Sequence, residues 1–326
     1  MQRRTYLLAG LLGVQFALAL ALSLSGPDHA SFKAKEPLLA FEPGAVDRID
    51  IDESGANFVT LAKRDGNWII PPMADFPAEG ERVAAFLGAL ASLKKGWAAA
   101  TTADAAQRFK VAEDGHERRI ILRKGDKTLA ELLLGTSPSF RQVYAREGSD
   151  PNIYSIAFST YDVGARGEDW MKRDVLSVPD EKIASVAIGD LKISRKDGRY
   201  VIADLANGET QKDSEVWKVA GASAHPVFDA VQGKGADALA KVNEPDIQVS
   251  IKTTDGSEVL LKYKKEAAGG AYLLSSSASN YLFRVSESAV EPLAKAKRET
   301  LVEAKHEGKG AEEAGKRDKA ERSNGG

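Results

Sequence analysis

The chain has 326 residues, of which 43% are hydrophobic and 28% charged, and this balance is typical of a folded protein long enough for two hydrophobic cores. Its 45 basic and 47 acidic residues give a formal net charge of −2, so there is no electrostatic reason to expect nucleic acid as a partner. The absence of cysteine excludes disulfides, thiolate catalysis and iron–sulfur clusters, and four scattered histidines leave little for a histidine metal site. We therefore predict no catalytic, cofactor-binding or metal-binding residues, and no cofactor.

The N-terminus carries a long apolar segment with no charged residue between positions 5 and 27. About 18 to 20 helical residues cover the roughly 30 Å of hydrocarbon in a bilayer, whereas the apolar part of a secretory signal is about 7 to 15 residues. The length therefore favours a transmembrane helix within residues 1–27. Because Arg3 and Arg4 precede it, the positive-inside rule predicts a single-pass protein of the cytoplasmic membrane with its bulk facing the periplasm.

A cleaved signal peptide is the alternative for this segment. Small residues suitable for a peptidase occur at Ala19 and Ala21, and again at Ser23 and Ser25. A lipoprotein is excluded because lipid attachment requires a cysteine. Residues 28–37 are polar, and we predict that they form a short tether between the anchor and the folded part.

The rest of the chain contains a repeated pattern. Three segments recur in the same order, with the offset falling from 137 to 132 to 129 residues: 46–51 as 183–188, 61–70 as 193–202, and 120–156 as 249–285. A duplication followed by small deletions leaves such a drift, and the alternative is chance similarity between short β patterns. The sequence predicts two tandem units, 38–176 and 177–300, followed by a charged disordered tail over 301–326.

Each predicted unit consists of strands, a helix and then further strands. Asp-Gly pairs at 65–66 and 197–198 lie between apolar runs and predict tight hairpin turns, because both residues tolerate a positive φ. We expect Trp68 and Tyr200, which follow the turns at matching positions, on the inner face of each sheet. Apolar residues at helical spacing over 83–93 predict a helix. Helices beside antiparallel sheets, without regular βαβ alternation, indicate the α+β class.

Few residues suggest chemistry. Asp50, Asp52 and Glu53 offer three carboxylates, but no glycine-bearing calcium loop accompanies them, and we interpret Asp50 and Asp52 as the solvated side of a strand. Residues 233–238 fit G-x-G-x-x-A, yet we predict a helical segment before them, where a dinucleotide site requires a strand. We interpret His116 as a surface residue.

Trp170 and Arg173 lie close together near the junction of the predicted units. One interpretation is structural: Trp170 fills the seam between the units and Arg173 pairs with a carboxylate. The other is a partner-docking surface, because Trp and Arg are typical anchors of protein interfaces. These two residues are the candidate partner-docking residues.

The combination of features resembles a known family. The features are the apolar N-terminus, Phe41-x-Pro43, Lys63-x-Asp65-Gly66-x-Trp68, Leu132-x-Leu134-Gly135 and Trp170-x-x-Arg173-x-x-Leu176. Together they resemble a bacterial family of membrane-anchored domains of unknown function. Its members are often encoded beside ABC-transporter components of the gliding-motility type. The chain departs from the family at Phe109-Lys110-Val111, where relatives commonly carry an aromatic-Gly-Leu sequence. The resemblance supplies no catalytic residue and implies an envelope role beside an ABC export system.

We therefore expect a membrane-tethered periplasmic accessory or scaffold protein, not an enzyme, that binds subunits of an ABC-type transport system. One alternative is an envelope glycan hydrolase that uses two carboxylates about 5 to 10 Å apart. Another is a module that binds a lipid or glycan in an apolar pocket.

Overall fold

The structure is a computed structural model, and it describes residue 15 and residues 36–267 and 269–305. Within these described residues, none of the helices combines the length and the apolar character that crossing a membrane requires. The predicted anchor at 1–27, residue 15 apart, and the predicted tail beyond residue 305 lie outside the described residues.

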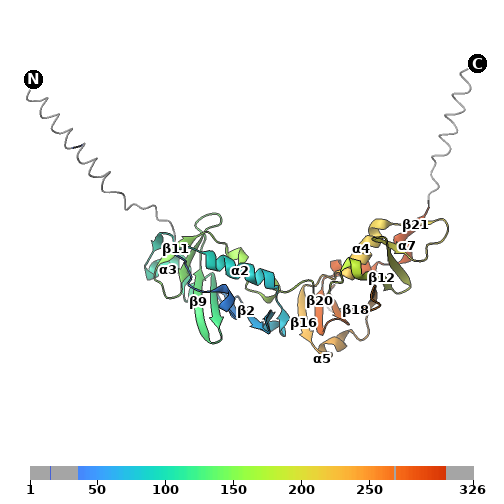
Figure 1. The fold of residues 1–326 in the computed structure, drawn as a ribbon, viewed down its shortest axis with the longest axis horizontal. Helices are drawn as coiled ribbons and strands as arrows, with labels where there is room; N and C mark the ends of the chain where they lie inside the picture. Colours follow the sequence, from blue (N-terminus) through green and yellow to red (C-terminus); the bar gives the residue numbers. More distant parts are fainter. Residues whose placement is uncertain (1–14, 16–35, 268, 306–326) are drawn as a thin grey trace, which may run out of the picture. The chain divides into compact units, whose positions relative to one another are not determined.

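The chain forms two compact units, which are drawn in Figure 1. Unit 1 comprises Met1–Pro72 and Pro77–Trp170, and unit 2 comprises Met73–Phe76 and Met171–Gly326, each as far as it is described. Both units are built on antiparallel sheets with few helices, so the predicted α+β class is confirmed, with sheet predominating.

Unit 1 has a sheet of nine strands in the order β4-β3-β2-β1-β8-β9-β10-β11-β5. From β3 to β5, neighbouring strands pair antiparallel. Ile51 lies opposite Ile120, and both are buried, because alternate residues of each strand face the core. The strands are β1 (Arg48–Glu53), β2 (Asn57–Arg64), β3 (Asn67–Ile70), β4 (Phe76–Pro77), β5 (Ala98–Ala100), β8 (Arg118–Lys124), β9 (Lys127–Leu134), β10 (Val143–Glu147) and β11 (Ile153–Ile156).

Helices and a small hairpin cover the two faces of this sheet. Helix α2 (Gly80–Ser92) crosses one face and buries four residues at helical spacing, as predicted, and it ends where Leu93 becomes extended. On the other face, α3 (Ala103–Arg108) and the hairpin β6–β7 pack over Leu133. The hairpin consists of β6 (Val111–Ala112) and β7 (Gly115–His116), and short 3-10 turns lie at Pro43–Ala45, Pro71–Met73, Thr160–Asp162 and Gly167–Asp169.

Unit 2 has a sheet of eight strands in the order β14-β13-β12-β17-β18-β19-β20-β16. Its strands are β12 (Ile183–Ile188), β13 (Leu191–Lys196), β14 (Arg199–Ile202), β16 (Ala230–Lys234), β17 (Ile247–Thr253), β18 (Glu258–Lys265), β19 (Tyr272–Ser276) and β20 (Tyr281–Val285). Its helices are α4 (Asp213–Ala224), α5 (Ala236–Leu239), α6 (Glu287–Ala294) and α7 (Arg298–Leu301), with 3-10 turns at Asp180–Lys182 and Ala240–Val242. A separate pair joins β15 (Glu209–Gln211) to β21 (Val302–Ala304).

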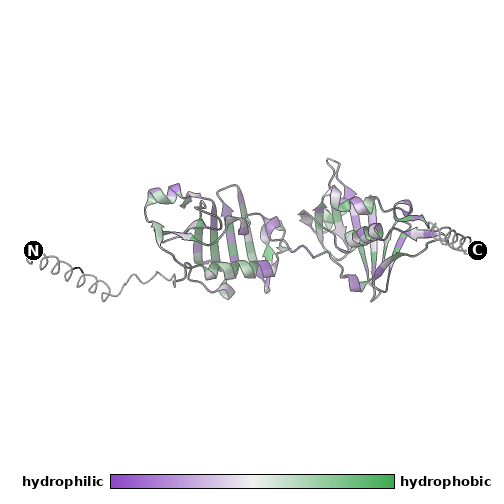
Figure 2. Cartoon of the chain, turned by 90° about the horizontal axis from the view of Figure 1, so that it is seen from above, coloured by the Kyte–Doolittle hydropathy of each residue, from purple (hydrophilic) through white to green (hydrophobic). Residues whose placement is uncertain are grey.

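The two sheets have the same order of corresponding strands. Apart from β4, the order β3-β2-β1-β8-β9-β10-β11-β5 in unit 1 matches β14-β13-β12-β17-β18-β19-β20-β16 in unit 2. The registers match as well, because Ile188 lies opposite Val249 just as Ile51 lies opposite Ile120. Figure 2 shows hydrophilic and hydrophobic bands alternating along the strands of both units.

Both predicted Asp-Gly turns are present as two-residue hairpin loops. The central residues have positive φ in each, at 51° and 83° for Asp65 and Gly66 and at 48° and 77° for Asp197 and Gly198. Trp68 and Tyr200 occupy matching positions after the turns, opposite Lys63 and Arg195. Tyr200 is buried as predicted, whereas Trp68 is only half-buried.

A short segment from early in the chain completes the core of unit 2. Phe76 is fully buried and packs edge-on against Phe228, Tyr281 and Phe283, with ring centroids 5.0 to 5.9 Å apart. The Tyr281 hydroxyl donates a hydrogen bond to the Asp75 carbonyl at 2.9 Å. The aromatic core of unit 2 therefore depends on residues about a hundred positions before its first strand.

Three local expectations differ from the structure. The chain from 301 to 304 is ordered as the end of α7 and as β21, which pairs with β15, so the predicted disorder does not hold there. Pro37, at the end of the predicted tether, forms a β-bridge with Lys94. Residues 230–234 form strand β16 rather than a helical segment, because they pair with β20, and only a four-residue helix follows them.

Candidate functional site

Trp170, one of the two predicted docking residues, is fully buried in unit 1. Its ring packs edge-on against Phe86, with centroids 5.2 Å apart, and the guanidinium of Arg82 lies 5.1 Å from the ring centroid. The indole nitrogen donates to the Gly164 carbonyl at 2.8 Å, and the Trp170 carbonyl accepts from the Glu79 amide at 2.8 Å. The structure therefore places Trp170 in a core and not on a surface.

Arg173, the second predicted docking residue, is exposed and belongs to unit 2. Its Nη1 donates to the Phe228 carbonyl at 2.7 Å, and its guanidinium lies 5.7 Å from the centroid of the Phe228 ring. The structure thus gives Arg173 a backbone carbonyl and an aromatic ring as partners, and its pairing with a carboxylate stays a prediction. Docking of a partner at Trp170 and Arg173 stays a prediction.

The acidic strand β1 does not present a solvated face at Asp50, whose exposed fraction is only 5%. Arg48 Nε lies 2.9 Å and Arg123 Nε 3.2 Å from its carboxylate oxygens, and Thr60 Oγ1 donates to it at 2.7 Å. Thr60 can do so because it lies directly opposite Asp50 in the register of β1 and β2. The interpretation as a solvated face is wrong for Asp50, because side chains from both neighbouring strands, Thr60 of β2 and Arg123 of β8, cover its carboxylate.

His116 is buried, not on the surface as predicted, because it binds the same strand. Its Nε2 lies 2.9 Å from Asp52 Oδ2, and its Nδ1 lies 3.2 Å from the Glu113 carbonyl oxygen. The contact with Asp52 ties the β6–β7 hairpin to strand β1 of unit 1.

Glu53, the last carboxylate of β1, also has side-chain partners. Arg118 lies 2.7 Å from Glu53, and Asn57 donates to Glu53 at 2.6 Å, and these two contacts, the Asn57 hydrogen bond first, hold the pKa of Glu53 below its usual range. Across the described ranges, no three His, Asp or Glu side chains converge as metal ligands would. The carboxylates of β1 are therefore paired with neighbouring side chains.

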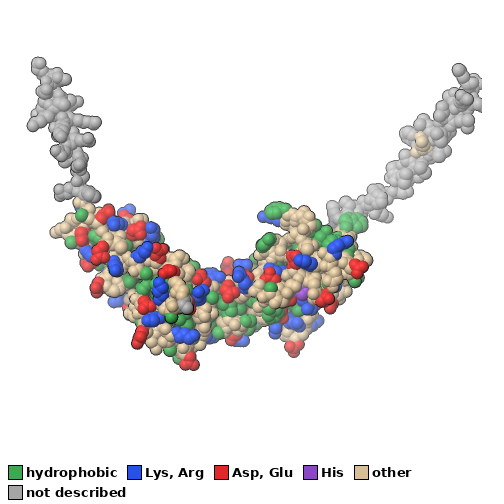
Figure 3. Space-filling view, turned by 180° about the vertical axis from the view of Figure 1, so that it is seen from behind, with side chains coloured by type: hydrophobic (Ala, Val, Ile, Leu, Met, Phe, Trp, Pro, Cys, Tyr) green, Lys and Arg blue, Asp and Glu red, His purple; other side chains and the backbone are tan. Residues whose placement is uncertain are grey.

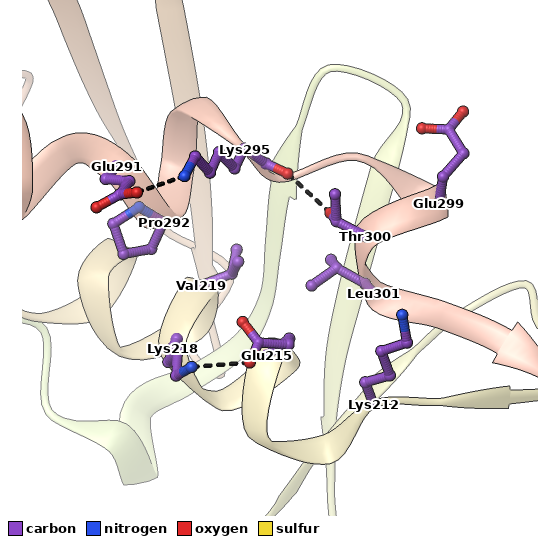
Figure 4. Close-up of a pocket in the computed structure, with 10 residues that line it drawn as sticks. All are labelled: Lys212, Glu215, Lys218, Val219, Glu291, Pro292, Lys295, Glu299, Thr300 and Leu301. Carbon is purple, nitrogen blue, oxygen red and sulfur yellow. Dashed lines mark hydrogen bonds and ion pairs between the residues drawn. The ribbon is translucent and has the colours of Figure 1, made fainter.

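Unit 2 has a groove with an apolar floor, bordered by α4, α6 and α7 and shown in Figure 4. Its volume is about 730 Å³. Val219, Pro292 and Leu301 supply the apolar surface, and the side chains of Val219 and Leu301 are anchored in the core. The remaining lining residues are polar: Lys212, Glu215, Lys218, Glu291, Lys295, Glu299 and Thr300. We call this hollow the α4–α6 groove.

Local sequence builds the walls of the α4–α6 groove. On α4, the buried stripe that includes Val216 and Val219 faces the sheet, which leaves Glu215 and Lys218 on the flank. The Thr300 hydroxyl donates to the Lys295 carbonyl at 2.8 Å, and this bond links the end of α6 to α7. One wall of the groove is thus formed by α6 and α7, which the Thr300 hydrogen bond links, and the other wall is α4, which packs on the sheet.

Two ion pairs flank the apolar floor in Figure 4. Lys218 and Glu215 lie 2.7 Å apart on α4, and Lys295 pairs with Glu291 on α6. The hydrogen bond and charge of Lys295 lower the pKa of Glu291, and Glu291 in turn raises the pKa of Lys295. Glu291 is therefore held in its ionised form, which suits recognition of a cation and opposes a role as a proton donor.

Lys212 and Glu299 are the charged lining residues best placed to bind a partner molecule. Within the part of the chain that the structure describes, neither side chain makes an ion pair or hydrogen bond. An ammonium and a carboxylate are thus available beside an apolar floor. This combination suits a peptide segment with both apolar and charged side chains.

Unit 1 has a smaller cleft at the equivalent place. Its volume is about 360 Å³, about half that of the α4–α6 groove. When Trp170 is aligned with Leu301, four lining positions correspond: Thr160, Tyr161, Gly164 and Asp169 in unit 1 with Glu291, Pro292, Lys295 and Thr300 in unit 2. When Glu79 is aligned with Lys212, Arg82 corresponds to Glu215. The two units therefore share the position of the hollow but line it with different chemistry.

Sequence reasoning missed the α4–α6 groove. The spacings of Glu215 with Lys218 and of Glu291 with Lys295 are those of ion pairs on a helix surface, and they were the available signal. The meeting of α4 with α6 and α7, about 70 residues later, has no signature in the local pattern. Figure 3 shows acidic and basic side chains interspersed over the face that it draws.

Comparison with known proteins identifies a family. A family model described as "Domain of unknown function (DUF4340)" matches residues 68–262, from β3 of unit 1 to β18 of unit 2. This is 195 of the 326 residues, which exceeds half of the chain. The resemblance to a domain-of-unknown-function family is thereby confirmed. No curated protein and no solved structure matches the chain.

Proposed function

The chain belongs to the DUF4340 family, and from this premise we propose that it is a membrane-tethered accessory or scaffold protein that binds another envelope protein. In this proposal residues 1–27 anchor it in the cytoplasmic membrane and the two units face the periplasm. The partner is a subunit of an ABC-type transport system. The partner class rests on the family resemblance, and the membrane location rests on the apolar, charge-free N-terminus.

The observation that carries the binding role is the α4–α6 groove. Its volume of about 730 Å³, its floor of Val219, Pro292 and Leu301, and the available charges of Lys212 and Glu299 together suit a partner segment. An apolar centre with a charged rim is the usual anatomy of a protein-binding site. We propose this groove as the docking site.

The charges of the groove favour binding over glycan hydrolysis. A carboxylate-dependent hydrolase requires one carboxylic acid with a raised pKa as proton donor. In the groove the pKa of Glu291 is lowered by Lys295, and Glu215 is paired with Lys218. Capture of a lipid or glycan in the groove is the alternative that crosslinking distinguishes.

The repeated architecture supports a further part of the proposal. The identical order of corresponding strands and the shared position of the hollows support an origin of the two units, about 38–176 and 177–300, by internal duplication. On this proposal the two units diverged in what their hollows bind, with arginines in unit 1 and lysine–glutamate pairs in unit 2.

Photo-crosslinking in cells tests the docking site. A photoreactive amino acid is placed at Lys212 or at Glu299 in the full chain, and at the exposed Lys127 at the start of β9 as the control. We expect crosslinks to transporter subunits, identified by mass spectrometry, from the two groove positions and not from position 127. Crosslinks to a lipid or glycan alone, or equal crosslinks from all three positions, would contradict the proposal.

Charge reversal gives an independent measurement. We expect Lys212→Glu combined with Glu299→Lys to reduce recovery of the partner at least about tenfold, because both rim charges then oppose those of the partner. Lys127→Glu is the matched surface control and leaves recovery unchanged. Protease added to spheroplasts tests the location, and protection of both units from digestion would contradict a periplasmic orientation.

A further inference from the structure

The most exposed large apolar side chains of the described residues all belong to unit 1. Tyr161, Phe140 and Trp97 have exposed fractions of 95%, 88% and 77%. Figure 3 shows apolar side chains projecting from this unit on the side where its described chain begins. Exposed aromatic side chains that gather in one place mark a surface that contacts another phase or molecule.

Sheet topology brings Trp97 and Phe140 to the same end of neighbouring strands. Strand β11 lies between β10 and β5 and is antiparallel to both, so β10 and β5 begin at the end where β11 stops. Trp97 directly precedes β5, Phe140 lies in the turn before β10, and Tyr161 follows β11. Because adjacent strands lie about 4.8 Å apart, the starts of β5 and β10 are about 10 Å apart. Tyr161 lies farther along this end, in the unit 1 cleft beside Glu53 and Arg82. We call Trp97 and Phe140 the aromatic end.

The chain joins unit 1 at this same end. Pro37 forms a β-bridge with Lys94, and the Lys95 amide donates to the Glu36 carbonyl at 3.0 Å. Lys94 is only three residues before Trp97. Nine residues, 28–36, separate this point from the end of the predicted anchor, and nine residues span at most about 30 Å. The tether therefore limits how far the aromatic end can lie from the membrane.

The chemistry of the aromatic end suits the lipid–water interface. Trp and Tyr are enriched at the level of lipid headgroups because the ring is apolar and its polar atom stays in water. The exposed side chain of Lys94 is close to Trp97 in the chain, and the guanidinium of Arg141 lies 5.4 Å from the Phe140 ring. Cations beside aromatic rings attract the anionic headgroups of such a surface.

We propose that the aromatic end of unit 1 docks on the lipid surface of the membrane that holds the anchor. This inference rests on the proposed membrane tether and adds which face of unit 1 meets the bilayer. Trp97 and Phe140 insert at headgroup level, and the docked sheet end orients unit 1 on the membrane. The α4–α6 groove belongs to the other unit and takes no part in this contact.

The absence of cysteine permits a site-by-site test in the full chain. Trp97→Cys and Phe140→Cys variants are spin-labelled and reconstituted into vesicles of phosphatidylethanolamine and phosphatidylglycerol. Collisions with oxygen, which partitions into lipid, are compared with collisions with a water-soluble nickel chelate. Trp217→Cys, at a 51% exposed tryptophan of α4, is the matched control, and Leu12→Cys reports on the predicted anchor.

The labels distinguish the possible outcomes. We expect labels at positions 97 and 140 to collide more often with oxygen than with nickel, and the label at position 217 to show the reverse. If positions 97 and 140 behave like position 217 while position 12 reports lipid, the anchor holds and the docking inference is overturned. If position 12 is open to nickel, the membrane tether fails and the docking inference fails with it.

Discussion

Trp170 and Leu301 hold equivalent positions at the ends of the two units. The carbonyl of each accepts a hydrogen bond of 2.8 Å from the residue just before the main helix, Glu79 in unit 1 and Lys212 in unit 2. Both side chains are buried, at 0% and 2% exposed. Each residue therefore closes the core of its own unit against the start of its helix.

Removal of either closing side chain is expected to destabilise one unit. Trp170→Ala should cost about 3 to 5 kcal/mol, and Leu301→Ala about 2 to 5 kcal/mol, because each leaves a cavity in a packed core. Hydrogen exchange followed by mass spectrometry should show faster exchange in α2 for the first variant and in α4 for the second. Trp217→Ala, at a half-exposed tryptophan, is the control and should change exchange far less. Unchanged exchange in α2 after Trp170→Ala would contradict the structure.

The hairpin glycines provide a matched pair of backbone tests. Gly66→Ala and Gly198→Ala should each destabilise by about 1 kcal/mol, because φ is +83° and +77° there while nothing else obstructs a Cβ. Gly88→Ala, at an exposed position inside α2, should instead stabilise by about 1 kcal/mol. Urea unfolding measures all three. If the free energy of unfolding changed in the same direction for Gly66→Ala and Gly88→Ala, the conformation at position 66 would not be left-handed.

The phenol of Tyr200 predicts a loss of stability at high pH. Burial, together with the 2.7 Å hydrogen bond to Asp180, raises the pKa of Tyr200 well above its usual value. Since the folded pKa is above the unfolded value of about 10, this contribution is complete below pH 10 and is lost as the pH rises further. Tyr200→Phe should cost about 1 kcal/mol at neutral pH, through loss of the hydrogen bond.

Comparison of urea midpoints at neutral pH and above pH 10 separates these effects. The natural protein should lose more stability over this range than Tyr200→Phe does. Tyr200→Phe should still lose some stability as the pH rises, because burial also raises the pKa of Tyr263. An equal loss in both proteins would mean that Tyr200 does not titrate differently in the folded state.

Replacement of the buried carboxylate of Asp50 by a neutral side chain is expected to lower the stability of the protein. Asp50→Asn should cost about 2 kcal/mol, because Arg48 and Arg123 then lose their shared counter-charge. Asp126→Asn, at an exposed position in the β8–β9 turn, is the control and should change stability by less than about 0.5 kcal/mol. Thermal and urea unfolding measure the difference, and equal stability of the two variants would rule out the buried network.

Phe76 tests the division of the chain into units. Phe76→Ala should cost about 3 to 5 kcal/mol and should speed hydrogen exchange in β20 of unit 2, where its ring packs against Tyr281 and Phe283. Faster exchange confined to unit 1 would instead mean that Phe76 belongs to the core of unit 1, which contradicts the structure. The exposed Phe58→Ala is the control and should leave β20 unchanged.

The amino-acid sequence by itself determined the features that depend on near neighbours in the chain. The Asp-Gly turns at 65–66 and 197–198 follow from residues that tolerate positive φ, and alternation such as Ile49, Asp50 and Ile51 follows from the two-residue period of a strand. The repeated order of elements follows from the same local patterns occurring twice. The α+β class was therefore readable before any tertiary contact was known.

Only the tertiary structure decided what surrounds each of these side chains. Asp50 has the sequence signature of a solvated strand position, yet it is buried because Arg123 and Thr60 reach it from the two strands beside its own. Phe76 belongs by number to the first half of the chain but fills a core made by strands about two hundred residues later. Burial, ion pairing and hollows depend on segments far apart in the chain coming together, and the local periodicity of a sequence does not encode which distant segments those are.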